Sequence, residues 1–206
     1  MWLYGFAKAV VGAAYRVAFR IRVEGLEHIP REGGVILCGN HFNGNDPIIA
    51  GIAAPRRVRF MAKEEIFTWP VIGWLARGVG AFPVKRGQPD RASLKTALDV
   101  LAKGGCFGIF PEGTRSRSGQ LRKAEPGTAY IALKSGVPVI PFGITSSYKL
   151  FGPVLIRFGP PVNLERFQGA KLSGESLELA GQEIMAAIGR LLEPPRHLLV
   201  AAGQED

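Results

Sequence analysis

Short apolar runs alternate with segments of helical periodicity along most of this chain, and this alternation restricts its fold more than any other feature. Apolar runs of strand length that alternate with helical patterns are typical of an α/β domain. We therefore predict a single α/β domain whose mixed, twisted sheet of about seven strands is flanked by helices. The runs expected to form strands are residues 19–23, 34–38, 58–62, 79–84, 106–110, 139–144 and 154–158.

The segments between these runs carry helix start signals. Asp90 is the expected N-cap of a helix over residues 91–103, and Asp46 is the expected N-cap of a helix that begins at Pro47 and continues to about Ala54. Further helices are expected over residues 1–20, 64–77, 126–135 and 176–192.

Length and composition favour a globular protein. The chain has 206 residues, of which 47% are hydrophobic and 21% are charged, and this is enough for one domain with a substantial core. No apolar run approaches the ~18 to 20 residues that a spanning helix needs. Cys38 and Cys106 each lie in an apolar run, without a Cys or His at metal-ligand spacing, so we expect buried, reduced thiols.

The first twenty residues combine aromatic side chains with cations. Such a helix can lie in a bilayer interface, with aromatic rings at headgroup level and cations toward anionic lipid. The alternative is a terminal helix that packs on the core of its own domain. No clear cleavage site of a secretory signal follows its apolar residues 9–15.

The net charge of +9 indicates an anionic partner. Residues 56–123 hold 14 Lys and Arg against 5 Asp and Glu, so this central segment alone carries a net charge of +9. Nucleic acid, an anionic membrane and a phosphorylated substrate all fit this charge. The chain contains no helix-turn-helix, zinc-ligand or aromatic-and-basic strand motif that would favour nucleic acid.

A histidine and a carboxylate five positions apart, His41 and Asp46, follow one of the apolar runs. Histidine can take a proton from a hydroxyl near neutral pH, and a carboxylate can hold the ring in one tautomer. Loops at the carboxyl ends of strands are also where open α/β sheets bind ligands. An Asp before Pro is equally an ordinary N-cap, and the spacing alone leaves both interpretations open.

Residues 110–116, with the sequence Phe-Pro-Glu-Gly-Thr-Arg-Ser, end another apolar run. Glu112, Thr114 and Arg115 place a carboxylate, a hydroxyl and a guanidinium on one short loop, and Gly113 allows a tight turn. Arginine can bind phosphate through paired hydrogen bonds. The alternative is a polar turn with a local Glu–Arg ion pair.

A third apolar run, residues 79–84, ends in the cations Lys85 and Arg86. Solvated charge at a strand end would explain them. If the three strand ends shared one edge of the sheet, Arg86 and Arg115 would join His41. Together they would suit proton abstraction from an alcohol that also bears a phosphate.

These motifs resemble the glycerolipid acyltransferases, in particular the lysophosphatidic acid (1-acyl-sn-glycerol-3-phosphate) acyltransferases, over roughly residues 20–160. That family has four ordered blocks, and all four occur here in order. Two departures are Lys85, where the family commonly has Asp, and the Ala-Glu-Pro-Gly that follows Lys123. The blocks are His41 with Asp46, Gly80 with Arg86, residues 110–116, and Val137 with Pro138 and Pro141.

The resemblance implies acyl transfer from a thioester, acyl-CoA or acyl carrier protein, to the hydroxyl of a glycerophospholipid. His41 would be the general base, and Asp46 would hold its ring, as in the histidine–carboxylate half of a catalytic triad. The residues expected to bind the acceptor are Arg86 and Arg115 at its phosphate, and Glu112, Gly113 and Thr114 around its glycerol.

The implied chemistry needs no metal and no cofactor beyond the acyl-CoA or acyl carrier protein co-substrate. The expected partners are this donor, a lysophospholipid and an anionic phospholipid membrane, with no nucleic acid. Residues 1–20 would be the membrane-contacting helix, residues 21–193 the acyltransferase domain and residues 194–206 a C-terminal tail. The protein would be peripheral or monotopic, on the cytoplasmic face of the cell membrane.

Two alternatives stay open. The acceptor could instead be glycerol-3-phosphate, another lysophospholipid or a lyso-aminolipid. The chain could also be a non-catalytic lipid- or nucleic-acid-binding module that keeps the α/β shell.

Overall fold

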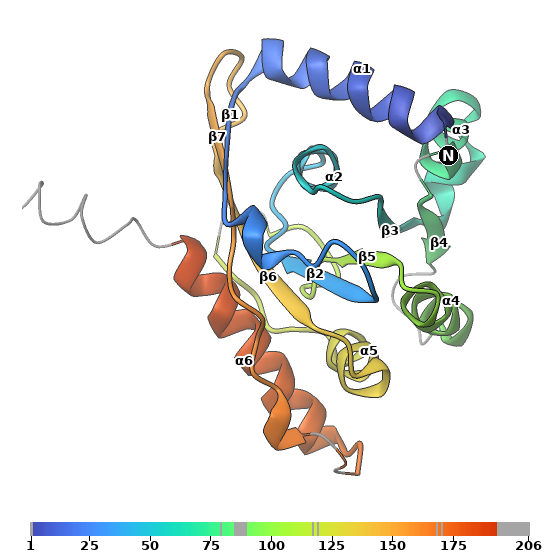
Figure 1. Ribbon diagram of the computed structural model, residues 1–206, viewed down its shortest axis with the longest axis vertical. Coiled ribbons are helices and arrows are strands. Elements are labelled where there is room, and N and C mark those ends of the chain that lie inside the picture. Colours follow the sequence, from blue (N-terminus) through green and yellow to red (C-terminus); the bar gives the residue numbers. More distant parts are fainter. Residues whose placement is uncertain are drawn as a thin grey trace, which may run out of the picture.

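A single mixed sheet forms the centre of the molecule (Figure 1). The computed structural model describes residues 2–78, 80–84, 90–116, 118, 120–167, 169 and 171–192. Within these ranges seven strands have the spatial order β1-β7-β6-β2-β5-β3-β4. They are β1 (Arg20–Glu24), β2 (Val35–Gly39), β3 (Val58–Lys63), β4 (Phe82–Val84), β5 (Cys106–Ile109), β6 (Val139–Ser146) and β7 (Pro153–Phe158).

The sheet is parallel except for one pair. Strands β6 and β7 are antiparallel and joined by a hairpin, whereas every other neighbouring pair is parallel. The mixed seven-stranded sheet predicted from the sequence is therefore confirmed.

The α-helices in the described ranges are α1 (Trp2–Ala18), α2 (Asp46–Ala53), α3 (Pro70–Gly78), α4 (Arg91–Ala102), α5 (Pro126–Ser135) and α6 (Gly174–Leu192). Short 3-10 helices are η1 (Leu26–His28), η2 (Glu64–Thr68) and η3 (Glu165–Phe167).

Helices cover both faces of the sheet, with α1 to α3 on one side and α4 to α6 on the other (Figure 1). The central strand β2 shows why, because all five of its residues are buried and its side chains alternate between the faces. Val35 and Leu37 pack in the cluster that contains Ile49 of α2. Ile36 and Cys38 pack in the cluster to which α4, α5 and α6 contribute side chains. Central parallel strands need this double cover.

Most helix boundaries agree with the signals in the sequence. Asp90 caps α4, because its side chain accepts a hydrogen bond from the Ser93 N–H. Gly136 ends α5 with a φ of 65°, in the left-handed region that favours glycine. The expected helix over residues 64–77 is divided into η2 and α3, and α3 begins at Pro70. The predicted tail, residues 194–206, lies outside the described residues.

One predicted helix start is wrong. Asn45, and not Asp46, is the N-cap of α2, and Asp46 is the first residue of that helix. The Asp46 carboxylate accepts hydrogen bonds from the N–H groups of Phe42 and Asn43, which precede the helix. The expected N-cap carboxylate is therefore used to hold the loop before α2.

Helix α1 is tied to the domain by its inner face. Tyr15 and Phe19 pack against the core cluster, and the Tyr15 hydroxyl donates to Asn45 Oδ1 at 2.7 Å. Lys8 donates a hydrogen bond to the carbonyl of Ala54 at the end of α2. Lys8 and Tyr15 thus tether this helix to the rest of the protein.

The outer face of α1 is apolar. Phe6, Val10, Ala13 and Val17 recur at helical spacing and are exposed. This arrangement is the reverse of an ordinary surface helix, which turns its apolar stripe inward. None of the described helices is long and apolar enough to cross a bilayer.

Both cysteines are buried free thiols, Cys38 on β2 and Cys106 on β5. Burial raises the pKa of each thiol, that of Cys106 to about 12. Neither thiol is therefore expected to form a reactive thiolate in the folded protein at neutral pH.

Candidate active site

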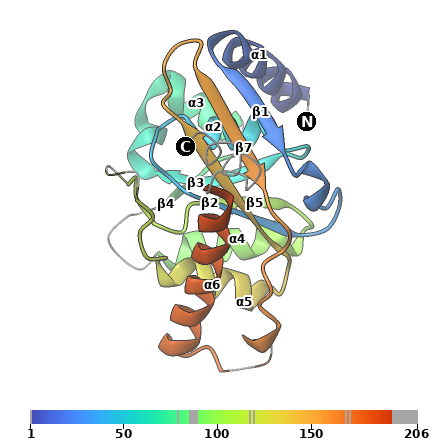
Figure 2. The ribbon, with the colours of Figure 1, turned by 90° about the vertical axis from the view of Figure 1, so that its left-hand side faces the viewer.

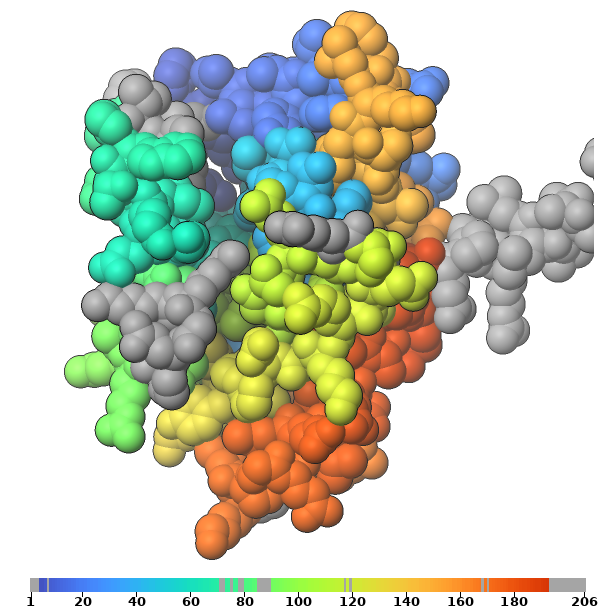
Figure 3. Space-filling view, turned by 180° about the vertical axis from the view of Figure 1, so that it is seen from behind, coloured from blue at the N-terminus to red at the C-terminus, as the bar shows by residue number. Residues whose placement is uncertain are grey.

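Three neighbouring strands end at the same edge of the sheet. Strands β6, β2 and β5 are adjacent and parallel, so their carboxyl ends lie together. The loops that follow them carry His41 after β2, Glu112 after β5 and Tyr148 after β6. Figure 3 shows residues 41–50, in light blue, bordered by the yellow-green segment after β5 and by the orange β6–β7 hairpin.

His41 and Asp46 form a buried hydrogen-bonded pair. His41 Nδ1 lies 2.9 Å from Asp46 Oδ2, and the His41 residue is only 8% exposed. Oδ2 also accepts two main-chain N–H groups, which can only donate. With Asp46 as a carboxylate, the shared proton belongs to Nδ1, and Nε2 holds the lone pair.

The Nε2 atom is the open position of this ring. Nε2 has no hydrogen-bond partner among the described residues. In the same part of the chain, no fully buried side-chain nitrogen or oxygen lacks a partner. Nε2 is therefore directed to space that a ligand or solvent can reach, as a general base requires.

Asp46 is fully buried and is held by four donors. Oδ2 accepts from the His41 ring and from the N–H groups of Phe42 and Asn43. Oδ1 accepts from the hydroxyl of Tyr148 at 2.7 Å. Both oxygens of this buried side chain are therefore hydrogen-bonded, as a buried polar group requires.

Tyr148 is the residue that the sequence reasoning missed. Burial and the neighbouring charge of Asp46 raise the pKa of Tyr148, so its hydroxyl stays protonated and donates. Its ring lies against those of Phe19 and Phe42. Its sequence signal was a tyrosine shortly after the predicted strand 139–144, and the strand order needed to interpret this signal is absent from the sequence.

The main chain of His41 is clamped from both sides by the loop after β5. The His41 N–H donates to Glu112 Oε1 at 2.9 Å, and the His41 carbonyl accepts from the Ser116 N–H at 2.7 Å. Glu112 is buried, and its other oxygen accepts from the Arg122 N–H at 3.2 Å. Both oxygens of Glu112 thus bind main-chain N–H groups. Its expected contact with the acceptor's glycerol stays a prediction.

Phe110 fixes the plane of the imidazole. The His41 and Phe110 rings are stacked with centroids 4.2 Å apart and an angle of 20° between their planes. Phe110 in turn stacks on Phe60 and meets Phe142 edge to face. With Nδ1 held by Asp46 and one ring face covered, the direction of Nε2 is set before any ligand arrives.

Asn40 continues the pairing between β2 and β6 beyond the regular ladder. Its Nδ2 donates to the Ile144 carbonyl at 2.9 Å, and its Oδ1 accepts from the Ile144 N–H at 2.8 Å. The Asn40 side chain is buried and both ends of its amide are satisfied. The chain therefore leaves the sheet at His41 without leaving Ile144 unpaired.

Arg115 extends from the loop after β5 toward the loop of the histidine. It is exposed, and a Cβ built on Gly44 would lie 3.8 Å from Arg115 Nη1. Gly113 has a φ of 66° and lies where a Cβ would collide with Glu125, so the turn requires glycine. Thr114 is exposed between them.

The remaining predicted phosphate ligand, Arg86, lies outside the described residues. Strand β4 is parallel to β3, so its carboxyl end lies at the same edge as the other loops. In the described part of the chain, no group of three or more His, Cys, Asp and Glu could hold a metal ion.

Comparison with known protein families identifies the family of this chain. The family model described as Acyltransferase matches residues 20–145, which is more than half of the chain. The chain therefore belongs to the acyltransferase family, as its four motif blocks suggested.

The relatives are more specific. The chain is similar to the 1-acyl-sn-glycerol-3-phosphate acyltransferase of Bacillus subtilis, at 29% identity over 171 residues, 80% of this chain and 85% of that protein. It is 33% identical to a chloroplastic 1-acyl-sn-glycerol-3-phosphate acyltransferase of Arabidopsis thaliana over 135 residues. That match covers 64% of this chain, which spans only 38% of the length of the plant protein.

A solved structure shares the architecture. The crystal structure of the 1-acyl-sn-glycerophosphate acyltransferase PlsC from Thermotoga maritima superposes with a TM-score of 0.66 at 26% identity. The match covers 93% of this chain and 79% of that chain. Most of this fold thus has a counterpart in an acyltransferase.

Replacing Glu112 should destabilise the protein because Glu112 binds two main-chain N–H groups from a buried position. An unsatisfied buried donor costs about 1–3 kcal/mol. We therefore expect Glu112→Ala to lower the free energy of unfolding by about 2–4 kcal/mol in urea denaturation. The control is Glu178→Ala, an exposed partner of Lys123, which should cost less than about 1 kcal/mol. Equal losses in the two variants would contradict the clamp.

Proposed function

We propose that this chain transfers a fatty acyl group from an acyl thioester to the free sn-2 hydroxyl of 1-acyl-glycerol-3-phosphate, giving phosphatidic acid. The observation that carries the proposal is the buried His41–Asp46 pair, whose Nε2 is open at the edge of the sheet. The similarity to the enzymes of Bacillus subtilis and Thermotoga maritima supports the same acceptor.

His41 acts as the general base in this reaction. Nε2 takes the proton of the acceptor's hydroxyl while the hydroxyl oxygen attacks the carbonyl carbon of the thioester. The carbon–sulfur bond then breaks, and the leaving thiolate takes the proton from His41. The acceptor itself is the nucleophile, so the step requires no covalent intermediate on the protein.

Asp46 holds the ring and stabilises the imidazolium that forms during the transfer. Four hydrogen bonds fix the carboxylate. Tyr148 is a positioning residue, because its hydroxyl touches Asp46 and not the reacting atoms. The stacked Phe110 ring covers one face of His41 and favours a single approach to Nε2.

The acceptor's phosphate is bound by Arg115 and Arg86. Arg115 is exposed beside the loop that holds His41 and Asp46, and its guanidinium can grip a phosphate in a bidentate manner. Gly113 and Thr114 shape the glycerol site, together with Glu112 through its hold on His41. The donor is acyl-CoA or acyl carrier protein, and no further cofactor takes part.

The substrate requires contact with a membrane. We place the apolar outer face of α1, with Phe6, Val10 and Val17, in the interface of an anionic phospholipid bilayer. The protein is then peripheral or monotopic on the cytoplasmic face of the cell membrane. Residues 1–20 serve as the contact, residues 21–193 as the acyltransferase domain and residues 194–206 as a tail.

A second acceptor class has its own support. The chain is 34% identical over 128 residues to the lyso-ornithine lipid O-acyltransferase of Pseudomonas aeruginosa, a match that covers 62% of this chain. A lyso-aminolipid acceptor lacks the phosphate. With such an acceptor Arg115 would have no phosphate to bind, whereas in the main proposal Arg115 binds the phosphate of the acceptor.

Removing the base should abolish turnover. We expect His41→Ala to lower kcat by about 10²- to 10⁴-fold, while acceptor and donor binding persist. The measurement is release of free thiol from palmitoyl-CoA with lysophosphatidic acid as acceptor, for the wild type beside the variant. A kcat close to that of the wild type would exclude His41 as the base.

A silent wild type would have to be tested with acyl carrier protein as donor and with glycerol-3-phosphate and a lyso-ornithine lipid as acceptors. If no pair gives thiol release but vesicle or oligonucleotide binding persists, the chain is a binding module and the proposed reaction is excluded.

Loss of the phosphate contact should weaken acceptor binding selectively. A hydrogen bond to a charged group contributes about 1.5–3 kcal/mol, so Arg115→Ala should raise the KM for lysophosphatidic acid about tenfold or more. The KM for palmitoyl-CoA should stay within about twofold. Lys123→Ala removes a cation from a side chain that is 93% exposed, and it should change neither constant. Equal changes in both KM values for Arg115→Ala would contradict the assignment.

Tyr148 should affect kcat and not substrate affinity. Tyr148→Phe removes one of the four donors to Asp46, and we expect kcat to fall about three- to tenfold with both KM values unchanged. The matched control is Tyr15→Phe, which removes a hydrogen bond of equal length to Asn45. If thermal midpoints fall alike but kcat falls only in Tyr148→Phe, the role is positioning. Equal kcat values in the two variants would refute it.

A further inference from the structure

The hairpin between β6 and β7 presents two large apolar side chains to solvent. Leu150 is 68% exposed and Phe151 is 62% exposed. The backbone at Tyr148 and Phe151 is in the left-handed region, with φ of 51° and 59°. Bulky residues rarely adopt this conformation, and it persists where the surroundings impose it. The hairpin tip, residues 147–152, therefore has a defined shape that turns Tyr148 inward and Leu150 and Phe151 outward.

The tip is fixed to the end of α1. The Phe151 N–H donates to the Ala18 carbonyl at 2.7 Å, and the Arg20 N–H donates to the Gly152 carbonyl at 2.9 Å. Val17, the neighbour of Ala18, is 73% exposed and belongs to the apolar outer face of α1. The tip thus continues the apolar surface of α1 on a rigid support.

The two segments that build this surface carry only positively charged side chains. Residues 2–23 and 139–156 contain no Asp or Glu. Because neither segment contains a carboxylate that an anionic membrane would repel, their charge is complementary to a bilayer of anionic lipids. The exposed cations of the two segments are Arg16, Arg20, Arg22 and Lys149, of which Arg22 pairs with Glu24 of β1.

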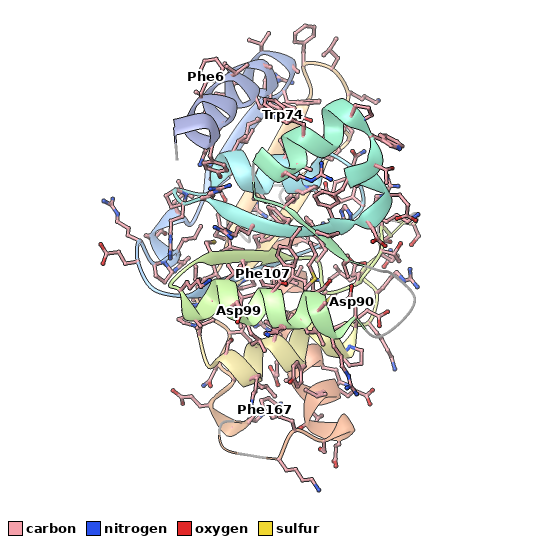
Figure 4. The ribbon with its side chains drawn as sticks, turned by 90° about the vertical axis from the view of Figure 1, so that its right-hand side faces the viewer. Phe6, Trp74, Asp90, Asp99, Phe107 and Phe167 are labelled. Carbon is pink, nitrogen blue, oxygen red and sulfur yellow. The ribbon has the colours of Figure 1, made fainter. Side chains whose placement is uncertain are left out.

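The views of the molecule place these elements at one end. The hairpin tip and α1 lie together at the top of Figures 1 and 2, and the first turns of α6 lie at the opposite end. In Figure 4, Phe6 of α1 and Trp74 of α3 lie at the end away from Phe167. Trp74 is also exposed. One end of the molecule therefore collects exposed apolar side chains from three elements.

We propose that the hairpin tip is a second membrane contact, which inserts Leu150 and Phe151 into the interface of an anionic bilayer beside α1. The choice of a lipid bilayer as the partner of this surface rests on the proposed function, because a lipid acceptor must be drawn from a bilayer. Tyr148, at the base of the tip, donates to Asp46. Insertion of the tip therefore sets the position of the catalytic pair relative to the bilayer.

An environment-sensitive thiol probe tests this contact. The two native cysteines are buried, so a probe such as NBD attaches selectively to an introduced exposed cysteine. The full-length variants are Leu150→Cys for the tip, Val10→Cys for α1 and Leu179→Cys as the control. Leu179 is exposed on α6. Each is mixed with vesicles of phosphatidylglycerol and phosphatidylcholine, and NBD emission is recorded.

Insertion predicts a blue shift and a several-fold rise in emission at positions 150 and 10, and none at position 179. A silent probe at position 150 beside a responding probe at position 10 overturns the tip contact and leaves α1 as the anchor. Silence at both positions overturns both contacts. Thiol release, measured on the same preparations, reports the proposed reaction independently, so the two failures are distinguishable.

A second variant tests the contribution of the tip. The double change Leu150→Ser and Phe151→Ser should lower the partition coefficient onto these vesicles about tenfold or more, with thermal midpoint and turnover of a short-chain, monomeric acceptor unchanged. Leu179→Ser should leave partition within about twofold. Unchanged partition of the double variant would overturn the proposal.

Discussion

The site depends on the two hydrogen bonds that hold the main chain of His41 between Glu112 and Ser116. These bonds join the loop after β5 to the loop after β2, two segments that are about seventy residues apart in the chain. With the backbone fixed, the ring needs only the Asp46 hydrogen bond and the Phe110 stack to be held in one orientation. The geometry of this candidate site therefore depends on the pairing of two loops at the sheet edge, and Glu112 contributes through main-chain contacts.

The predictions from the sequence succeeded where the signal was local. The strands could be recognised because each is a short apolar run, and a pairing of His41 with Asp46 could be proposed because the two residues are only five positions apart. The sequence could not reveal Tyr148, which is 102 residues from Asp46. Nor could it show that Glu112 binds His41. Both contacts depend on the strand order β6-β2-β5, which no local pattern encodes.

Helix α1 shows a similar limit. The sequence predicted the helix and left open whether it contacts a membrane or packs on the domain, and it did not say which side of the helix faces the protein. The structure turns the apolar stripe outward and uses Lys8 and Tyr15 as inward tethers. The prediction that Asp46 would cap α2 was wrong for a related reason: the carboxylate binds N–H groups of the preceding loop. Arg86 stays a prediction, since it lies outside the described residues.

The Asn40 amide has a consequence for which substitutions its position can accept. Its carboxamide copies a peptide group, offering one donor and one acceptor to Ile144 in the spacing of a strand neighbour. Aspartate would supply only acceptors and leucine neither, whereas glutamine would carry the amide one carbon further. The backbone can thus leave the sheet at Asn40, one residue before the histidine. The hydrogen bonds between this segment and β6 nevertheless continue as far as Ile144. The side chain at position 40 thus replaces the main chain as the hydrogen-bond partner of β6, at the point where the loop bends away from the sheet.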